Sequence, residues 1–169
     1  MGQRKLTFED HQQGNFKVPV SVVADNIGLK ENIGSLFRLC DALAVEHLYL
    51  ARADAGLDNK ISKVARSTEK NVPHSVTPSP LETIAQLRQD GYSIITLELT
   101  TQSIKIQDFD FSRYKKICLI LGNEARGVSD ELLQASDHCI HIPMLGMNSS
   151  MNVISAASIA LFEITRHMT

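Results

Sequence analysis

Apolar residues along this chain fall into short groups separated by polar loops, and the groups alternate between strand-like and helix-like spacing. Compact apolar runs at residues 20–24, 45–50, 72–76, 92–99, 117–121 and 139–143 are typical of buried strands. Helical spacing instead marks residues 33–43, 59–67, 80–90, 130–135 and 153–167. This alternation predicts an α/β fold with a mostly parallel sheet and helices on both faces.

Polar residues at the helix starts give more local predictions. Ser79 is expected to cap the helix that follows it, and Glu82 can reach back to complete a capping box. By the same reasoning, Asn32 is the expected N-cap of the first helix, and Ser149 or Ser150 that of the last.

The final helix, residues 153–167, is apolar on nearly every side. A helix of this kind is buried on more than one side. At the end of a small domain, this predicts that a second subunit covers part of it, as in a homodimer.

Length and composition bound the class of protein. The 169 residues suit a single domain, residues 1–169, with about residues 1–18 as a short N-terminal arm. Hydrophobic residues make up 43% of the chain and charged residues 21%, as in an ordered globular protein. No apolar run approaches the ~20 residues that span a bilayer. The first residues lack the apolar stretch of a signal peptide, so we expect a cytoplasmic protein.

Several kinds of site are disfavoured. The sequence has no GxxxxGK phosphate-binding loop, no GxGxxG after the first strand and no GxSxG elbow. His138 and His141 flank Cys139, but residues three apart on a strand point to opposite faces, so no metal site is expected there. The cysteines are isolated among apolar neighbours, which indicates buried, reduced thiols.

Net charge says little about a binding partner, because it is only −2. Basic side chains do gather locally at Lys60, Lys63, Arg66 and Lys70. A solvated helix face is the more common explanation of such a cluster, and a nucleic-acid surface is the alternative.

Three segments hold polar residues at strand ends or helix starts. In the first, Asn32 and Gly34 open a helix, and Arg38 follows on an otherwise apolar surface. Such a charge either pairs with Asp41 or has a functional task.

The other two segments follow predicted strands. One contains Gly122, Glu124 and Gly127, where backbone amides can approach a ligand beyond the strand end; a tight surface turn is the alternative. The other contains methionine and small polar residues between Ile142 and Met151, which could enclose an adenine; a methionine-rich core loop is the alternative.

Together, these segments resemble the three signature motifs of the SpoU (TrmH-like) family in the SPOUT superfamily, in the family's order and spacing. The matching residues are Asn32, Gly34 and Arg38 in the first motif, Gly122-Asn123-Glu124 and Gly127 in the second, and Ile142-Pro143-Met144, Gly146 and Ser150-Met151-Asn152-Val153 in the third. The resemblance covers nearly the whole chain from about Val20. Family members often carry proline shortly before the first asparagine, where this chain has Lys30-Glu31.

The resemblance implies a fold and an activity. The family fold is an α/β sheet with a deep C-terminal trefoil knot, and its members work as homodimers. They transfer a methyl group from S-adenosylmethionine to a ribose 2'-hydroxyl of tRNA or rRNA. The implied cofactor-binding residues are Leu97, Gly122, Asn123, Gly127, Ile142, Met144 and Met151, and the implied catalytic residues are Arg38, Asn32, Glu124, Ser150 and Asn152.

Two of the implied roles concern positive charge. Arginine keeps its proton in proteins, so Arg38 is expected to orient an RNA phosphate and stabilise developing oxyanion charge rather than act as a base. The candidate phosphate contacts are Lys60, Lys63, Arg66 and Arg126.

Two other functions stay open at this point. One is methylation of an RNA base, as in other branches of the superfamily. The second is a knotted module that binds RNA or cofactor without turnover. The presence of Arg38, Glu124 and Asn152 argues against it, because a site that has lost its activity is expected to have lost at least one of them. The sequence does not indicate which RNA or nucleotide is modified, or whether a partner protein helps select it.

Overall fold

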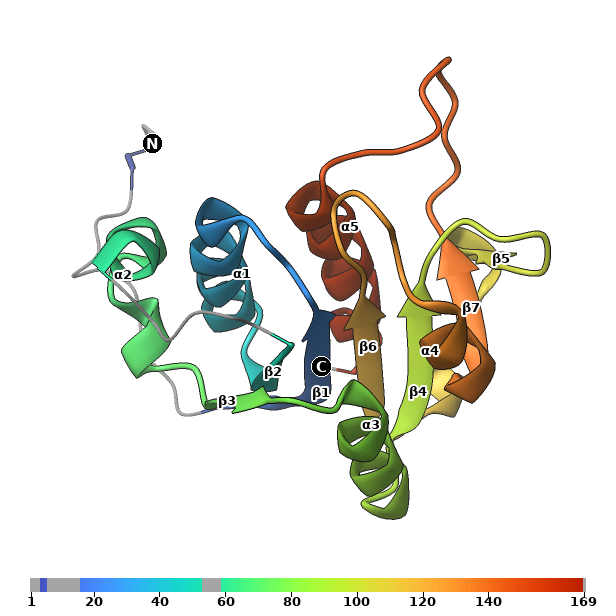
Figure 1. Ribbon diagram of the computed structural model, residues 1–169, viewed down its shortest axis with the longest axis horizontal. Helices are drawn as coiled ribbons and strands as arrows, with labels where there is room; N and C mark the ends of the chain where they lie inside the picture. The colour runs from blue at the N-terminus through green and yellow to red at the C-terminus, as the bar shows by residue number, and fades with distance from the viewer. Residues whose placement is uncertain (1–3, 6–15, 53–58, 169) are drawn as a thin grey trace.

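The computed structural model describes residues 4–5, 16–52 and 59–168. Within these residues, seven strands form one open sheet in which all paired neighbours are parallel (Figure 1). The strand order is β3-β2-β1-β6-β4-β7-β5. The strands are β1 Val18–Asp25, β2 Val45–Ala51, β3 His74–Thr77, β4 Ser93–Leu97, β5 Ile104–Lys105, β6 Ile117–Leu121 and β7 His138–His141.

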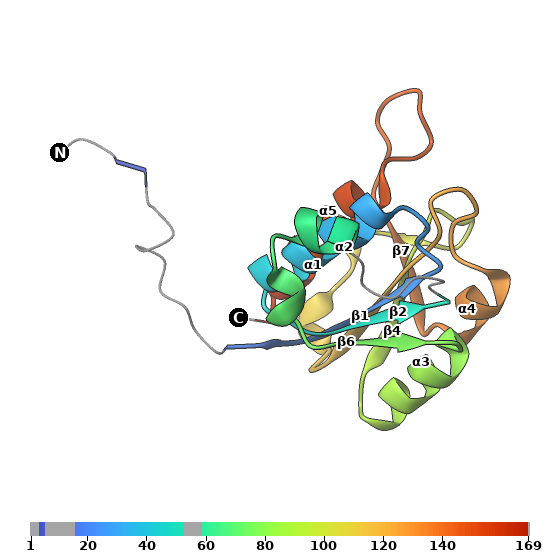
Figure 2. The ribbon, with the colours of Figure 1, turned by 60° about the vertical axis from the view of Figure 1, so that its left-hand side comes forward.

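Helices cover both faces of this sheet, as predicted. They are α1 Lys30–Ala42, α2 Asn59–Ala65, α3 Pro80–Gln89, α4 Asp130–Ala135 and α5 Val153–Thr165, with short 3-10 turns at Thr68–Lys70, Ile106–Asp108 and Phe111–Arg113. The first face carries α1, α2 and α5, and the second carries α3 and α4 (Figure 2). No helix in the described ranges is long and apolar enough to cross a membrane.

Side chains alternate along the central strands, and this alternation builds a core on each face. On β1, Val22 packs in the core beneath α1 and α5, whereas Val23 packs beneath α3 and α4. On β6, Leu119 and Ile120 divide in the same way. Every residue of β6 is buried, as a strand covered on both faces requires.

The hydrophobic pattern places most elements correctly. The bounds of β6 and α4 are those predicted. The pattern does not predict β5, because two residues are too few to show a period. The predicted strand at 92–99 ends earlier, at Leu97. The N-terminal arm lies largely outside the described residues, and Val18 already belongs to β1.

The helix caps test the local predictions. Ser79 is confirmed as the N-cap of α3, since its hydroxyl accepts a hydrogen bond of 3.2 Å from the N–H of Glu82. The prediction that Asn32 caps α1 is wrong. The helix begins earlier, at Lys30, with Leu29 at the N-cap position. Asn32 therefore lies inside the first turn. The hydrophobic pattern missed the start of the helix because Lys30 is polar.

The predicted cap of α5 is also wrong. Ser149 and Ser150 lie too far before the helix to reach its first amides. Asn152 occupies the N-cap position, and its Oδ1 accepts hydrogen bonds from the N–H groups of Ile154 at 2.9 Å and Ser155 at 3.3 Å. The third segment thus enters α5 through an asparagine cap.

Candidate active site

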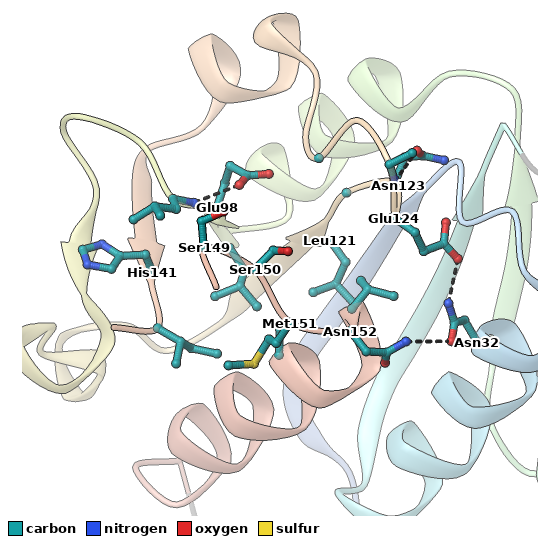
Figure 3. A pocket seen from close by; sticks show the side chains of 18 of the residues that line it. Asn32, Glu98, Leu121, Asn123, Glu124, His141, Ser149, Ser150, Met151 and Asn152 are labelled. Atoms are coloured by element: carbon teal, nitrogen blue, oxygen red, sulfur yellow. Dashed lines mark hydrogen bonds between the residues drawn. The ribbon is translucent and has the colours of Figure 1, made fainter. Parts of the chain in front are cut away.

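A cavity opens where β4, β6 and β7 end at the carboxyl edge of the sheet (Figure 3). Its volume is about 380 Å³, within the range of ~300–1,000 Å³ typical of small-molecule sites. Its lining comes from within residues 29–32, 97–99, 121–127, 141–144 and 149–156. All three candidate segments therefore meet at one place, although they are far apart in the sequence.

The carboxylate of Glu124 is held at the cavity wall by donors from the start of α1. Its Oε1 accepts hydrogen bonds from Asn32 Nδ2 at 2.7 Å and from the N–H of Leu29 at 3.2 Å, and its Oε2 accepts one from the N–H of Gly28 at 3.1 Å. Partial burial acts to raise the pKa of Glu124, but the hydrogen bonds outweigh burial and the pKa lies below its ordinary value. Glu124 is thus an oriented, ionised carboxylate and not merely a solvated turn residue.

Asn152 extends this arrangement into a row of three side chains, which we call the amide row (Glu124, Asn32 and Asn152). Asn152 Nδ2 donates a hydrogen bond of 3.3 Å to Asn32 Oδ1, and Asn32 Nδ2 donates to Glu124 (Figure 3). Because Asn152 Oδ1 is engaged by the first amides of α5, its Nδ2 must point toward Asn32. The row fixes α1, the turn after β6 and the start of α5 relative to one another.

The turn after β6 is compact because two glycines approach each other. A Cβ added to Gly122 would lie 2.3 Å from the carbonyl carbon of Gly127, and Gly127 itself has a φ of +67°. Asn123 and Gly127 exchange backbone hydrogen bonds of 3.0 and 2.9 Å. The Asn123 side chain donates to the carbonyl of Asn26 at 2.7 Å, which ties the turn to the end of β1.

Glu98 also lines the cavity, although no motif points to it. Its Oε2 accepts a hydrogen bond from the N–H of Val128, and its Oε1 accepts one from the N–H of Leu99, both at 2.9 Å. His141, the last residue of β7, lies in the lining as well. Both residues stand at or just after the end of a parallel strand, and that position is the signal that could have identified them.

Comparison with known proteins identifies the family. Residues 19–162 match the SpoU rRNA Methylase family. The chain belongs to this family. Among SpoU relatives, the tRNA (guanosine(18)-2'-O)-methyltransferase of Aquifex aeolicus is 33% identical over 146 residues, which are 86% of this chain and 68% of that protein. The 23S rRNA (guanosine-2'-O-)-methyltransferase RlmB of Ralstonia nicotianae is 30% identical over 164 residues, which are 95% of this chain and 64% of that protein.

Solved SpoU structures share the fold. The A. aeolicus TrmH/SpoU tRNA modifying enzyme superposes with a TM-score of 0.80 at 30% identity, covering 89% of this chain and 76% of that one. AviRb from Streptomyces viridochromogenes, in complex with the cofactor AdoMet, gives 0.79 at 28% identity, covering 89% of this chain and 61% of that one. The chain thus spans between 61% and 76% of the length of these four relatives.

Each residue expected to bind the SpoU cofactor lines the cavity: Leu97, Gly122, Asn123, Gly127, Ile142, Met144 and Met151. The third segment is not a core loop. It projects from the body of the protein (Figure 2), and Leu145 and Met147 near its tip are 98% and 106% exposed. Its two ends form one wall of the cavity, while its middle faces solvent.

The expected catalytic residues divide into two groups. Those that line the cavity are Asn32, Glu124, Ser150 and Asn152. Arg38 does not line it. Arg38 is exposed on α1. It lies about 9 Å further along the helix axis than Asn32 and is rotated about that axis by about 240° from it. Within the described ranges, its side chain forms no ion pair with Asp41 and no hydrogen bond.

The residues expected to contact RNA lie in two places. Arg126 is exposed in the turn after β6, between lining residues of the cavity. Lys60, Lys63 and Arg66 belong to α2 or follow it directly, and α1 lies between α2 and α5, whose start lines the cavity (Figure 1). Lys63 and Arg66 are exposed, whereas Lys60 forms an ion pair of 2.7 Å with Glu31.

The histidine and cysteine side chains singled out in the sequence have other residues of the protein as neighbours. His138 Nε2 lies 2.7 Å from the Tyr114 hydroxyl, and His141 Nδ1 lies 2.9 Å from the Ser103 hydroxyl, so the two rings serve different partners. The described residues contain no group of three or more potential ligands placed to hold a metal ion. Burial raises the pKa of the Cys40 thiol to about 12, which makes it unreactive. Cys139 is only half-buried, so the prediction of a buried thiol is wrong for it.

Proposed function

We propose that this protein transfers a methyl group from S-adenosylmethionine to the 2'-hydroxyl of a ribose in tRNA or rRNA. The observation that carries the proposal is the meeting of three family motifs at one cavity, with Glu124, Asn32 and Asn152 joined in the amide row. The similar proteins are named as 2'-O-methyltransferases of tRNA and of 23S rRNA, so both RNA classes are candidates. Both occur in the cytoplasm, where we propose that the protein acts.

The cavity fits S-adenosylmethionine in size, surface and charge. Its volume of about 380 Å³ suits a ligand of this class. Leu97, Ile142 and Met151 offer apolar surface to an adenine, and Gly122 presents backbone without a side chain in between. The carboxylates in the lining are opposite in sign to a sulfonium and an ammonium. When bound, the cofactor supplies a methyl carbon made electrophilic by the positive sulfur.

The residues of the protein hold the ribose in place. Methyl transfer requires the attacking oxygen in line with the carbon and sulfur, at roughly 3–3.5 Å from the carbon. The amide row is fixed at both ends, by the Leu29 and Gly28 amides at Glu124 and by α5 at Asn152. A row fixed in this way keeps its polar groups in place beside a bound ribose.

Arg38 is proposed to act on the RNA from outside the cavity. It is charged and exposed on α1, and within the described part of the chain it has no competing partner. RNA that enters the cavity and continues across α1 meets this guanidinium, which can bind and orient a phosphate of the RNA. Ser150 at the cavity wall is proposed to assist in holding the ribose.

We also propose a homodimer. Ile159 and Phe162 on α5 are 44% and 60% exposed, and they form the uncovered part of the apolar helix. A second copy packed on α5 would remove these side chains from water. Size-exclusion chromatography with light scattering should give twice the chain mass, and Phe162→Glu should shift it to the monomer.

The trefoil knot remains a proposal, supported by the chain path. After β7, near one edge of the sheet, the chain continues through the projecting third segment and returns as α5, which packs against α1 and β4 (Figure 1). A knot requires in addition that this returning end of the chain passes through a loop, and we propose that it does so here. The TM-score of 0.80 to a SpoU structure supports it as well.

A transfer assay tests the proposed function. Incubation with bulk tRNA and rRNA and with methyl-labelled S-adenosylmethionine should place label in RNA, and nucleoside analysis should identify 2'-O-methylribose. Arg38→Ala should abolish transfer while the cofactor still binds. Label in a methylated base favours the base-methylation alternative, and cofactor binding without any transfer favours the silent module. Full activity of Arg38→Ala contradicts its proposed role.

A further inference from the structure

The charges in the cavity are unbalanced. Among the described residues that line it, Glu98, Glu124 and His141 are the ionisable side chains, and neither lysine nor arginine contributes to the lining. Neither carboxylate forms an ion pair with another described residue. A partly apolar cavity with two carboxylates and no fixed cation attracts positive ligands.

The two carboxylates have separate neighbours. Glu124 belongs to the amide row on the side of α1, whereas Glu98 lies apart from it, beside the ends of β4 and β7 (Figure 3). The amides of Val128 and Leu99 hold the Glu98 carboxylate, but they carry no net charge and leave its negative charge uncompensated. Glu98 is therefore fixed in the cavity without being part of the row proposed to hold ribose.

Gly127 contributes to this placement. A Cβ at Gly127 would lie 2.3 Å from Glu98 Oε2, so the carboxylate occupies the space that a larger residue would fill. The close approach sets the carboxylate against the turn that follows β6. The same turn contributes Gly122 and Asn123 to the lining. The Glu98 carboxylate is thus half-buried against this turn, at the wall of the cavity.

We propose that Glu98 is the residue by which the cavity favours S-adenosylmethionine over the product S-adenosylhomocysteine. The inference rests on the proposed function. In the reaction, a bond forms between the ribose oxygen and the methyl carbon. The bond between that carbon and sulfur breaks with its electron pair left on sulfur, and the hydroxyl proton passes to solvent. The two ligands therefore differ by a methyl group and one positive charge.

Glu98 attracts the charged ligand and has no such attraction for the neutral sulfur of the product. Two opposite unit charges several ångströms apart attract each other with a strength set by the dielectric constant, which here lies between that of water and that of a protein surface. Loss of this attraction corresponds to about a tenfold loss of affinity. Glu98 thus acts as a specificity-determining residue that favours substrate entry and product release. It is distinct from the residues proposed to hold the ribose.

Calorimetric titration of the full chain tests this inference with three ligands: S-adenosylmethionine, S-adenosylhomocysteine and sinefungin, in which an amine-bearing carbon replaces the sulfonium. Glu98→Gln should weaken binding of the two ligands charged at this position about tenfold, and binding of S-adenosylhomocysteine by less than about twofold. The matched control is Glu82→Gln, an exposed glutamate on α3 at the opposite face of the sheet, which should change none of the three.

Equal weakening of all three ligands by Glu98→Gln would mean a structural role, and unchanged binding would mean that its charge is not felt. Either result overturns the inference and leaves the proposed function standing, because the unaltered protein still binds S-adenosylmethionine. Failure of the unaltered protein to bind it contradicts both. Glu98→Asp keeps the charge and provides a second test. It should preserve the preference for the charged ligands even if overall affinity falls, and loss of that preference overturns the inference.

Discussion

Replacement of Gly122 by alanine should open the turn on which the cavity depends. The added Cβ would lie 2.3 Å from the carbonyl carbon of Gly127 and 2.4 Å from the nitrogen of Val128. Both are backbone atoms, so no side chain can rotate out of the way. The turn must therefore move away from β6. This movement strains the paired hydrogen bonds between Asn123 and Gly127 and the bond from Val128 to Glu98.

The size of the effect follows from these contacts. Forcing an extra carbon into a packed site costs about 1–3 kcal/mol, and each weakened hydrogen bond adds about 0.5–1.5 kcal/mol. Because part of the strain is relieved when the turn shifts, we expect the free energy of unfolding to fall by about 2–4 kcal/mol. Affinity for S-adenosylmethionine should fall as well, because the shifted amides no longer face the cavity.

Urea unfolding followed by circular dichroism measures the stability change, since the chain contains no tryptophan to report by fluorescence. Gly146→Ala is the matched control, because a Cβ at Gly146 meets nothing within 4 Å. It should change stability by less than about 0.5 kcal/mol. If Gly122→Ala unfolds at the same urea concentration as the unaltered protein and binds the cofactor equally well, the steric reasoning is refuted.

Substitutions at three other places test the cap of α5, the charge of Glu124 and the basic residues near α2. Asn152→Ala should lower stability by about 1 kcal/mol through the lost cap of α5. Asn152→Ser should restore most of that stability but not methyl transfer, since serine can cap the helix without reaching Asn32. The pKa of Glu124 is lowered from 4.5, so its stabilising contribution is present above about pH 4.5 and lost as pH falls through the lower folded value. The difference in urea midpoint between Glu124→Gln and the unaltered protein should therefore shrink as the pH falls below 4.5 and through the folded pKa of Glu124. Lys63→Ala with Arg66→Ala should weaken RNA binding at all sequences and reduce its salt dependence, with cofactor affinity unchanged; equal loss of both affinities would count against a phosphate-contact role.

Much of the fold follows from local pattern. β6 is a continuous apolar run between turn signals. A run of this length is typical of a strand that is buried on both faces. The cavity could also be placed, because loops after parallel strands meet at one edge of the sheet. β5 escaped prediction because its two residues depend on pairing with β7 and not on any periodicity of their own.

What the sequence does not contain is the partner of each polar group. Asn32 has the type of a helix cap, but its amide bonds to Glu124, which lies 92 positions away in the chain. Glu98 carries no motif, and one of the two amides that hold its carboxylate belongs to Val128, which lies 30 positions away in the chain. Arg38 matches its motif, yet the pattern could not reveal that it is exposed on α1 and does not line the cavity. Contacts of this kind are set by tertiary folding.

Alkaline hydrolysis of the labelled RNA distinguishes methyl transfer to a ribose oxygen from methyl transfer to a base. Alkali cleaves RNA through attack of each free 2'-hydroxyl on the adjacent phosphate, so a methylated hydroxyl protects one bond. We expect the label transferred by the protein to be recovered in alkali-resistant dinucleotides. Label recovered only in mononucleotides, on the base, would contradict it.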